Sequence, residues 1–105
     1  QKAFEWATMA PKISAREAYD MGFVNRCVPA EELDEAVAQF TDYYKQAPTK
    51  AIGLIKKMLE KGASANLDEM LDYEAYCQEI AGNSSDHKEG VTAFNEKRRP
   101  QFKGQ

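Results

Sequence analysis

The chain contains 105 residues, of which 43% are hydrophobic and 30% are charged, a composition typical of one globular domain with a modest core. Its formal net charge of −3 argues against non-specific binding of nucleic acid. No apolar run approaches the roughly 20 residues that span a bilayer. We therefore expect a cytoplasmic protein without a nucleic-acid partner or a membrane contact. Cys27 and Cys77 lack metal-site spacing, so both are predicted to be reduced thiols and no metal site is expected.

The N-terminal part of the chain predicts two short helices and one extended segment. Residues 1–7 begin without Met and resemble the interior of a helix, so we expect the chain to be a fragment or an excised domain. Ser14 and Glu17 form a capping box for a short helix that ends at Gly22. Residues 23–28 are β-prone and bounded by Gly and Pro, so we expect an extended piece there.

Three longer helices follow. From residue 29 or 30 to 47 the apolar positions keep helical spacing, and acidic residues crowd the first turns. Pro48 ends this helix and suits the first turn of the next, whose apolar stripe stops at Gly62. Asn66 and Glu69 resemble a capping box that opens the third. The sequence as a whole predicts a mainly α fold of four to five helices with at most one short extended segment.

The C-terminal region reads as a helix stop, a cap, a short helix and a cationic tail. Gly82 is expected to end one helix in the left-handed conformation, and Ser84 or Ser85 to cap the next. Pro100 closes the element. Gly90 lies inside the helix at a cost of about 1 kcal/mol relative to alanine, which predicts that another group packs closely against the backbone there.

Phe94 and Lys97 are three residues apart and are predicted to share one face of this helix. An aromatic ring beside an ammonium suits a purine attached to a phosphate. On spacing alone, the favoured interpretation is plainer: Phe94 anchors a core and Lys97 is a solvated charge, because such pairs are common on amphipathic helices.

Two motifs lie near the chain ends. The first is Ile13-Ser14-Ala15-x-Glu17-Ala18-x-x-x-Gly22-x-Val24-Asn25, and the second is Asp86-x-x-Glu89-Gly90-Val91-x-Ala93-Phe94-x-Glu96-Lys97-Arg98-x-Pro100-x-Phe102-x-Gly104. In their order and separation they resemble motifs of the enoyl-CoA hydratase/isomerase (crotonase) superfamily. The resemblance covers nearly the whole chain and implies the C-terminal part of a crotonase-type fold. Residues 1–28 would then close the spiral-core domain, and residues 29–105 would form the C-terminal helical domain that covers CoA and makes oligomer contacts.

The resemblance also implies a chemistry. Enzymes of this family act on acyl-CoA thioesters and stabilise a thioester enolate with two backbone amides. The corresponding loops and acidic catalytic residues lie upstream of the matching segment, so no catalytic residue is assigned here and the chain alone is expected to be inactive. Phe94 and Lys97 match the positions near the adenine and the 3′-phosphate of CoA. CoA enters as part of the substrate, without a further cofactor, and the intact protein is expected to be a homo-oligomer, a trimer or a dimer of trimers.

Within the superfamily, several segments look most similar to the phenylacetate-pathway isomerase that acts on a ring-epoxide acyl-CoA. These are Gly53-Leu54-Ile55-Lys56, Asn66-Leu67-Asp68, Leu71-Asp72-x-Glu74 and Gln78-x-x-Ala81-Gly82-x-Ser84-x-Asp86. Two alternatives for the intact enzyme stay open, a general 2-enoyl-CoA hydratase and a Δ3,Δ2-enoyl-CoA isomerase. So does a different class, a stand-alone helical module that uses Phe94, Phe102 and the tail to bind a protein groove without enzymatic activity.

Overall fold

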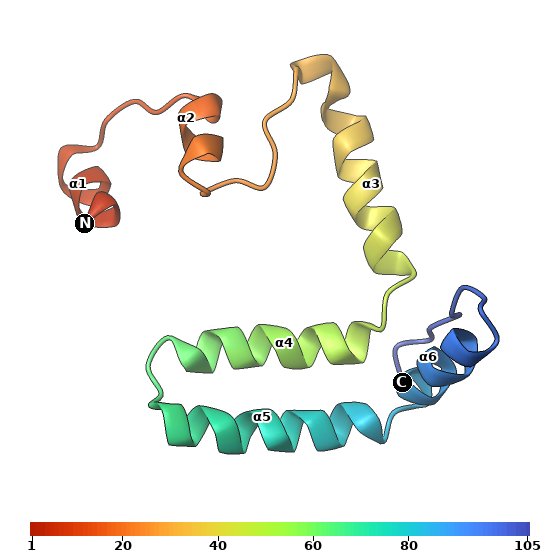
Figure 1. Cartoon of the computed structure of the whole chain (residues 1–105). Coiled ribbons are helices and arrows are strands. Elements are labelled where there is room, and N and C mark those ends of the chain that lie inside the picture. Colours follow the sequence, from red (N-terminus) through yellow and green to blue (C-terminus); the bar gives the residue numbers. More distant parts are fainter. The chain divides into compact units, whose positions relative to one another are not determined.

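The computed structural model describes residues 1–105 and contains six α-helices, one 3-10 helix and no strand (Figure 1). The helices are α1 (Lys2–Met9), α2 (Ala15–Asp20), η1 (Ala30–Glu32), α3 (Leu33–Lys45), α4 (Thr49–Gly62), α5 (Leu67–Gly82) and α6 (Ser85–Asn95). The predicted mainly α class is confirmed. The chain divides into two compact units, residues 1–37 and 38–105. The predicted domain boundary after residue 28 concerns the family's domains and stays a prediction.

The first unit is built from local interactions. Ser14 forms the predicted capping box: its Oγ accepts the Glu17 N–H at 3.2 Å, and a Glu17 oxygen accepts the Ser14 N–H at 2.9 Å. The rings of Trp6 and Phe23 stack with centroids 4.4 Å apart. Residues 1–37 contain no buried residue.

The predicted extended segment at 23–28 is wrong in its first half, because residues 23–25 bend. Gly22 takes a positive φ of 76° at the end of α2, and the Phe23 N–H donates back to the Ala18 carbonyl at 2.8 Å. Phe23 therefore closes the helix instead of starting a strand. No second strand is available to pair with, and a single strand is not stable by itself.

In the second unit, α4 and α5 form an antiparallel hairpin and α6 follows α5 at a corner (Figure 1). Pro48 is the N-cap of α4, one position before the predicted first turn. Asn66 forms the predicted capping box: its side chain accepts the Glu69 N–H at 3.0 Å, and Glu69 accepts the Asn66 N–H at 3.2 Å.

The predicted left-handed stop at Gly82 is wrong. Gly82 is the last residue of α5, and the cap is Asn83 with a φ of −82°, in the right-handed region. Ser84 ends the helix by its own side chain, because its Oγ–H donates to the Ala81 carbonyl at 2.6 Å. The same oxygen accepts the His87 N–H at 3.0 Å and so begins α6. One serine therefore supplies both the stop and the cap, and no left-handed residue is needed.

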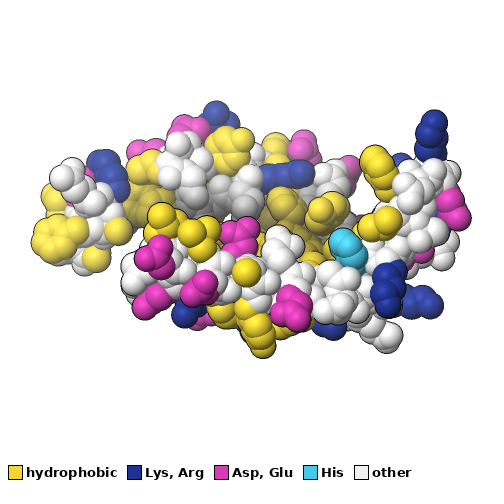
Figure 2. Space-filling model, turned by 60° about the horizontal axis from the view of Figure 1, so that its bottom comes forward, with side chains coloured by type: hydrophobic (Ala, Val, Ile, Leu, Met, Phe, Trp, Pro, Cys, Tyr) yellow, Lys and Arg dark blue, Asp and Glu magenta, His cyan; other side chains and the backbone are white.

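Few residues are buried, and many large hydrophobic side chains remain at the surface. The buried hydrophobic residues are Ala47, Cys77 and Ala93. Hydrophobic side chains are exposed at many places on the face drawn in Figure 2, and the exposed residues of the second unit include Phe40, Tyr43, Tyr44, Ile55, Leu59, Leu67, Leu71, Tyr76, Val91 and Phe94. None of the helices combines the length and the apolarity that crossing a bilayer requires.

Candidate functional site

The N-terminal turn of α6 binds the end of the chain. The Asp86 carboxylate, only 4% exposed, accepts the backbone N–H of Lys103 at 2.7 Å and that of Gly104 at 2.8 Å. The Gln105 carbonyl in turn accepts the Asp86 N–H at 3.1 Å and the Ser85 hydroxyl at 2.9 Å. Asp86 in the first turn of α6 therefore fixes the chain end against this helix.

A second carboxylate holds the chain a few residues earlier. Glu89 pairs with the Arg98 guanidinium through two bonds, at 2.6 and 3.0 Å, and also accepts the Gln101 N–H at 2.8 Å. The hydrogen bond from Arg98, followed by that from the Gln101 amide, lowers the pKa of Glu89 to about 2. The same pairing raises the pKa of Arg98. Both charges are therefore fixed over the whole physiological range of pH.

Two glycines of this unit lie where the chain end meets the helices. A Cβ at Gly90 would lie 3.7 Å from the Phe102 ring, an ordinary van der Waals contact, so the group predicted to pack at Gly90 is Phe102, although the space there would also accept a Cβ. Gly104 has a φ of 77°, and a Cβ there would lie 2.5 Å from the Thr49 hydroxyl at the start of α4. A side chain at Gly104 would require the Thr49 hydroxyl or the chain end to move, and the positive φ disfavours any residue other than glycine there.

The predicted shared helical face of Phe94 and Lys97 is wrong, because α6 ends at Asn95. Lys97 takes a left-handed φ of 55°. Its N–H donates to the Phe94 carbonyl at 3.2 Å, and the Arg98 N–H donates to the Ala93 carbonyl at 3.0 Å. These two bonds form a Schellman motif with lysine at the position that glycine usually takes. Lys97 is exposed, and its backbone direction no longer follows the helix.

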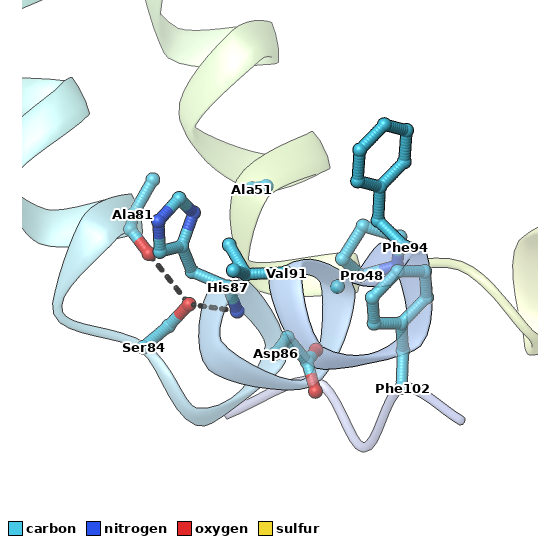
Figure 3. Close-up of a pocket in the computed structure, with 10 residues that line it drawn as sticks. Pro48, Ala51, Ala81, Ser84, Asp86, His87, Val91, Phe94 and Phe102 are labelled. Atoms are coloured by element: carbon cyan, nitrogen blue, oxygen red, sulfur yellow. Dashed lines mark hydrogen bonds between the residues drawn. The ribbon is translucent and has the colours of Figure 1, made fainter. Parts of the chain in front are cut away.

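Phe94 stands at an open, mostly apolar pocket of ≈ 390 Å³ formed by the N-terminus of α4, the end of α5, α6 and the chain end. Figure 3 shows the Phe94 ring projecting away from α6, with Phe102 and Pro48 below it and His87 on the other side beside Ala81. The lining residues are Pro48, Ala51, Ala81, Ser84, Asp86, His87, Gly90, Val91, Phe94 and Phe102. Phe94 is 83% exposed, so the interpretation that it anchors a core within this chain is wrong.

The walls of the pocket are mostly aromatic and aliphatic, so the pocket is suited to binding a ligand. Of the two titratable residues in its lining, Asp86 has both carboxylate oxygens bound to backbone amides, and His87 is the other. Such walls suit a flat apolar or aromatic group, which gains stacking and desolvation there. Lys97 lies outside the lining. Neither Phe102 nor His87 was predicted to line the pocket. The place of Phe102 depends on where the chain end folds, and no pattern in the sequence marks His87 of α6 as a lining residue.

The enoyl-CoA hydratase/isomerase family model matches residues 1–105. The chain is 36% identical over 103 residues to the 1,2-epoxyphenylacetyl-CoA isomerase of Escherichia coli, covering 98% of this chain and 39% of that protein. It is 33% identical over 93 residues to the crotonyl-CoA hydratase of Syntrophomonas wolfei, covering 89% of this chain and 36% of that protein. The predicted resemblances to the superfamily and to the ring-epoxide isomerase are both confirmed.

The same family is found among solved structures. The crystal structure of an enoyl-CoA hydratase subunit from Geobacillus kaustophilus superposes with a TM-score of 0.90 at 36% identity, covering 99% of this chain and 40% of that chain. The chain therefore spans about 40% of the length of the relatives that it matches. The helical arrangement described above is that of the corresponding part of this fold.

Proposed function

The chain belongs to the enoyl-CoA hydratase/isomerase family, and on this premise we propose that it is the C-terminal helical part of an enzyme that acts on acyl-CoA thioesters. Its role is to bind the CoA end of the substrate and to make oligomer contacts, while the groups that stabilise the thioester enolate lie elsewhere in the enzyme. The similarity to 1,2-epoxyphenylacetyl-CoA isomerase makes a ring-epoxide acyl-CoA the first substrate to test, and crotonyl-CoA the second.

The observation that carries this proposal is the exposed Phe94 ring at an apolar pocket, with a lysine three residues further along the chain. An adenine base stacks on an aromatic ring and gains from leaving water. The Lys97 ammonium forms no salt bridge with any residue, so it is available to a compact phosphate. We assign the adenine to Phe94 and the 3′-phosphate to Lys97, and we assign no residue of the chain to bond making.

Lys97→Ala in the intact protein tests this assignment. We expect a loss of CoA affinity on the order of 1 kcal/mol, as for one charge-assisted hydrogen bond. In turnover it should raise KM and leave kcat nearly unchanged, because binding remote from the reacting carbon is equal in ground and transition states. The matched control is Lys88→Ala, an exposed lysine on α6 that does not line the pocket.

A comparison of acyl-CoA with acyl-dephospho-CoA tests whether Lys97 contacts the 3′-phosphate. Acyl-dephospho-CoA lacks the 3′-phosphate, so Lys97→Ala should leave its KM almost unchanged while raising that of acyl-CoA. Equal effects on both ligands, or no effect on either, would show that Lys97 is only a solvated charge at a helix end. Phe94→Ala should weaken both ligands alike, because both carry the adenine.

The exposed apolar side chains support the second part of the proposal, a homo-oligomer that is a trimer or a dimer of trimers. Light scattering of the intact protein at micromolar concentration tests it, and a monomer would contradict it. The alternative of a stand-alone interaction module is less favoured, because the family match covers every residue of the chain.

A further inference from the structure

Residues 98–105, here called the C-terminal strap, contain no helix or strand. Their order depends on contacts with α6 and with Thr49 of α4. Fixing each backbone residue in one conformation costs roughly 1–2 kcal/mol, so a strap without secondary structure needs specific bonds to hold it. The structure provides them through Asp86 and Glu89, two carboxylates on successive turns of α6.

The two carboxylates bind the residues on either side of Phe102. Glu89 accepts the N–H of Gln101 at 2.8 Å, and Asp86 accepts the N–H of Lys103 at 2.7 Å. Phe102 itself lies between these two anchors, and its ring packs over Gly90, where a Cβ would be 3.7 Å away. The backbone is therefore fixed on both sides of Phe102, and the Phe102 ring packs against α6. Figure 3 shows the result, with Phe102 below Phe94 in the wall of the pocket.

We propose that Asp86 and Glu89 are positioning residues for the pocket, because they hold the strap in the place that makes Phe102 one of its walls. Neither carboxylate needs to touch the ligand. Both act through the backbone of the strap, and the order of the strap and the affinity of the pocket are therefore coupled. This inference rests on the proposed function of the pocket as the site for the adenine end of CoA.

The bonds are strong enough for this role. Hydrogen bonds from amides to an ionised carboxylate are roughly twice as strong as those between neutral groups. Asp86 is buried, and Glu89 is partly shielded and paired with Arg98 through two bonds. If the carboxylates lose their charge, we expect the strap to detach more often and Phe102 to leave the pocket wall with it.

The experiment is a thermodynamic cycle in the intact protein, with CoA itself as the titrated ligand. The variants are Asp86→Asn with Glu89→Gln, Phe102→Ala, and all three together. The matched control is Glu96→Gln, which removes a carboxylate that pairs with the same Arg98 but binds no amide of the strap. Amide hydrogen exchange at Lys103 and Gly104 reports the order of the strap without any ligand.

We expect the carboxylate pair variant and Phe102→Ala each to weaken CoA binding on the order of fivefold, which corresponds to the loss of about one good contact. The triple variant should be no weaker than Phe102→Ala alone, since the carboxylates act only through that ring. Exchange at Lys103 and Gly104 should accelerate in the carboxylate variants, while Glu96→Gln should change neither measurement. Should Asp86→Asn fail to fold, Glu89→Gln alone, at a less buried position, gives the same comparison with a smaller effect.

Two outcomes overturn the inference and leave the proposed function standing. Either Phe102→Ala leaves CoA binding unchanged although Phe94→Ala weakens it, or the carboxylate substitutions weaken binding equally with and without Phe102. If the unsubstituted protein does not bind CoA, the proposed function fails instead. In that case, unchanged exchange at Lys103 and Gly104 in the carboxylate variants would also overturn the positioning role.

Discussion

The two ends of this chain are held by different kinds of contact. The side-chain hydrogen bonds of α1 and α2 link residues three or four positions apart, as in the Ser14 and Glu17 capping box. Those between α6 and the strap link residues 9 to 20 positions apart. Local bonds stabilise a helix that is already forming, whereas distant bonds also fix how two segments pack. Because short helices are marginal in water, α1 and α2 depend more on further packing than α6 does.

Hydrogen exchange on the 105-residue chain is the most direct test of this difference between the two chain ends. We expect the protection factors of backbone amides in α1 and α2, measured against unstructured peptides, to be on the order of a hundredfold lower than those in α5 and α6. The reason is that opening free energies within one protein range from near zero to the global value. Mass spectrometry of peptides from residues 2–20 and 70–95 measures the ratio. Equal protection in both sets would contradict the contrast drawn here.

Two serine substitutions compare how much one helix cap contributes to the free energy of unfolding at each end of the chain. Ser84→Ala removes a buried cap that serves two helices and should lower the free energy of unfolding by about 1–2 kcal/mol. Ser14→Ala removes an exposed cap of α2 and should change the global value by less than about 0.5 kcal/mol. Urea titrations of the two variants test this, and a larger loss for Ser14→Ala would contradict it.

The sequence predicted the helix starts well, because capping is a local interaction. Ser14 with Glu17, and Asn66 with Glu69, are three residues apart, and both capping boxes form. The positions of the helix ends at Gly22, Gly62 and Gly82 were predicted too, but the way in which a helix ends was predicted less well. Gly82 indicated a left-handed stop, but a Ser84 side chain ends the helix instead, and the left-handed residue at the end of α6 is Lys97, where no glycine marks it.

The candidate site was predicted only in part, for a similar reason. Phe94 was assigned to the site by its match to the family motif, whereas its spacing alone favoured a core anchor, and it lies at the pocket. The partner of Gly90 was predicted to exist but not named, because Phe102 reaches it only after the strap turns back along α6. Bonds across 12 to 18 residues, such as those of Asp86 and Glu89, leave no periodic pattern in a sequence.

Lys97→Gly separates stability from binding at the end of α6. Glycine takes a positive φ at no steric cost, so we expect the free energy of unfolding to rise by about 1 kcal/mol. CoA affinity should fall as in Lys97→Ala, which keeps the left-handed strain and should leave stability nearly unchanged. Thermal unfolding and CoA titration of both variants provide the test. A glycine variant that gains no stability would show that the backbone at Lys97 is not strained.

The smallest expected effect is the dependence of the strap on pH. The pKa of Glu89 is about 2 in the folded chain, against an ordinary value of 4.5, because Arg98 and the Gln101 amide stabilise its ionised form. The stabilisation from this carboxylate is fully present above pH 4.5, where the unfolded chain is ionised too. It is lost as the pH falls from 4.5 to about 2, because the unfolded chain then binds a proton before the folded chain does.

Glu89→Gln removes this dependence. Its thermal midpoint should lie slightly below that of the unsubstituted chain at pH 6, since partly exposed ion pairs contribute little, and the two should converge near pH 2. The matched control is Glu60→Gln on α4, which removes an exposed carboxylate that forms no salt bridge. Thermal unfolding at half-unit steps from pH 6 to pH 2 gives the curves. If the difference between Glu89→Gln and the unsubstituted chain stays constant across that range, Glu89 does not hold the strap through its charge. The contrast between the two chain ends would then rest on the bonds that Asp86 and Ser85 form with the strap.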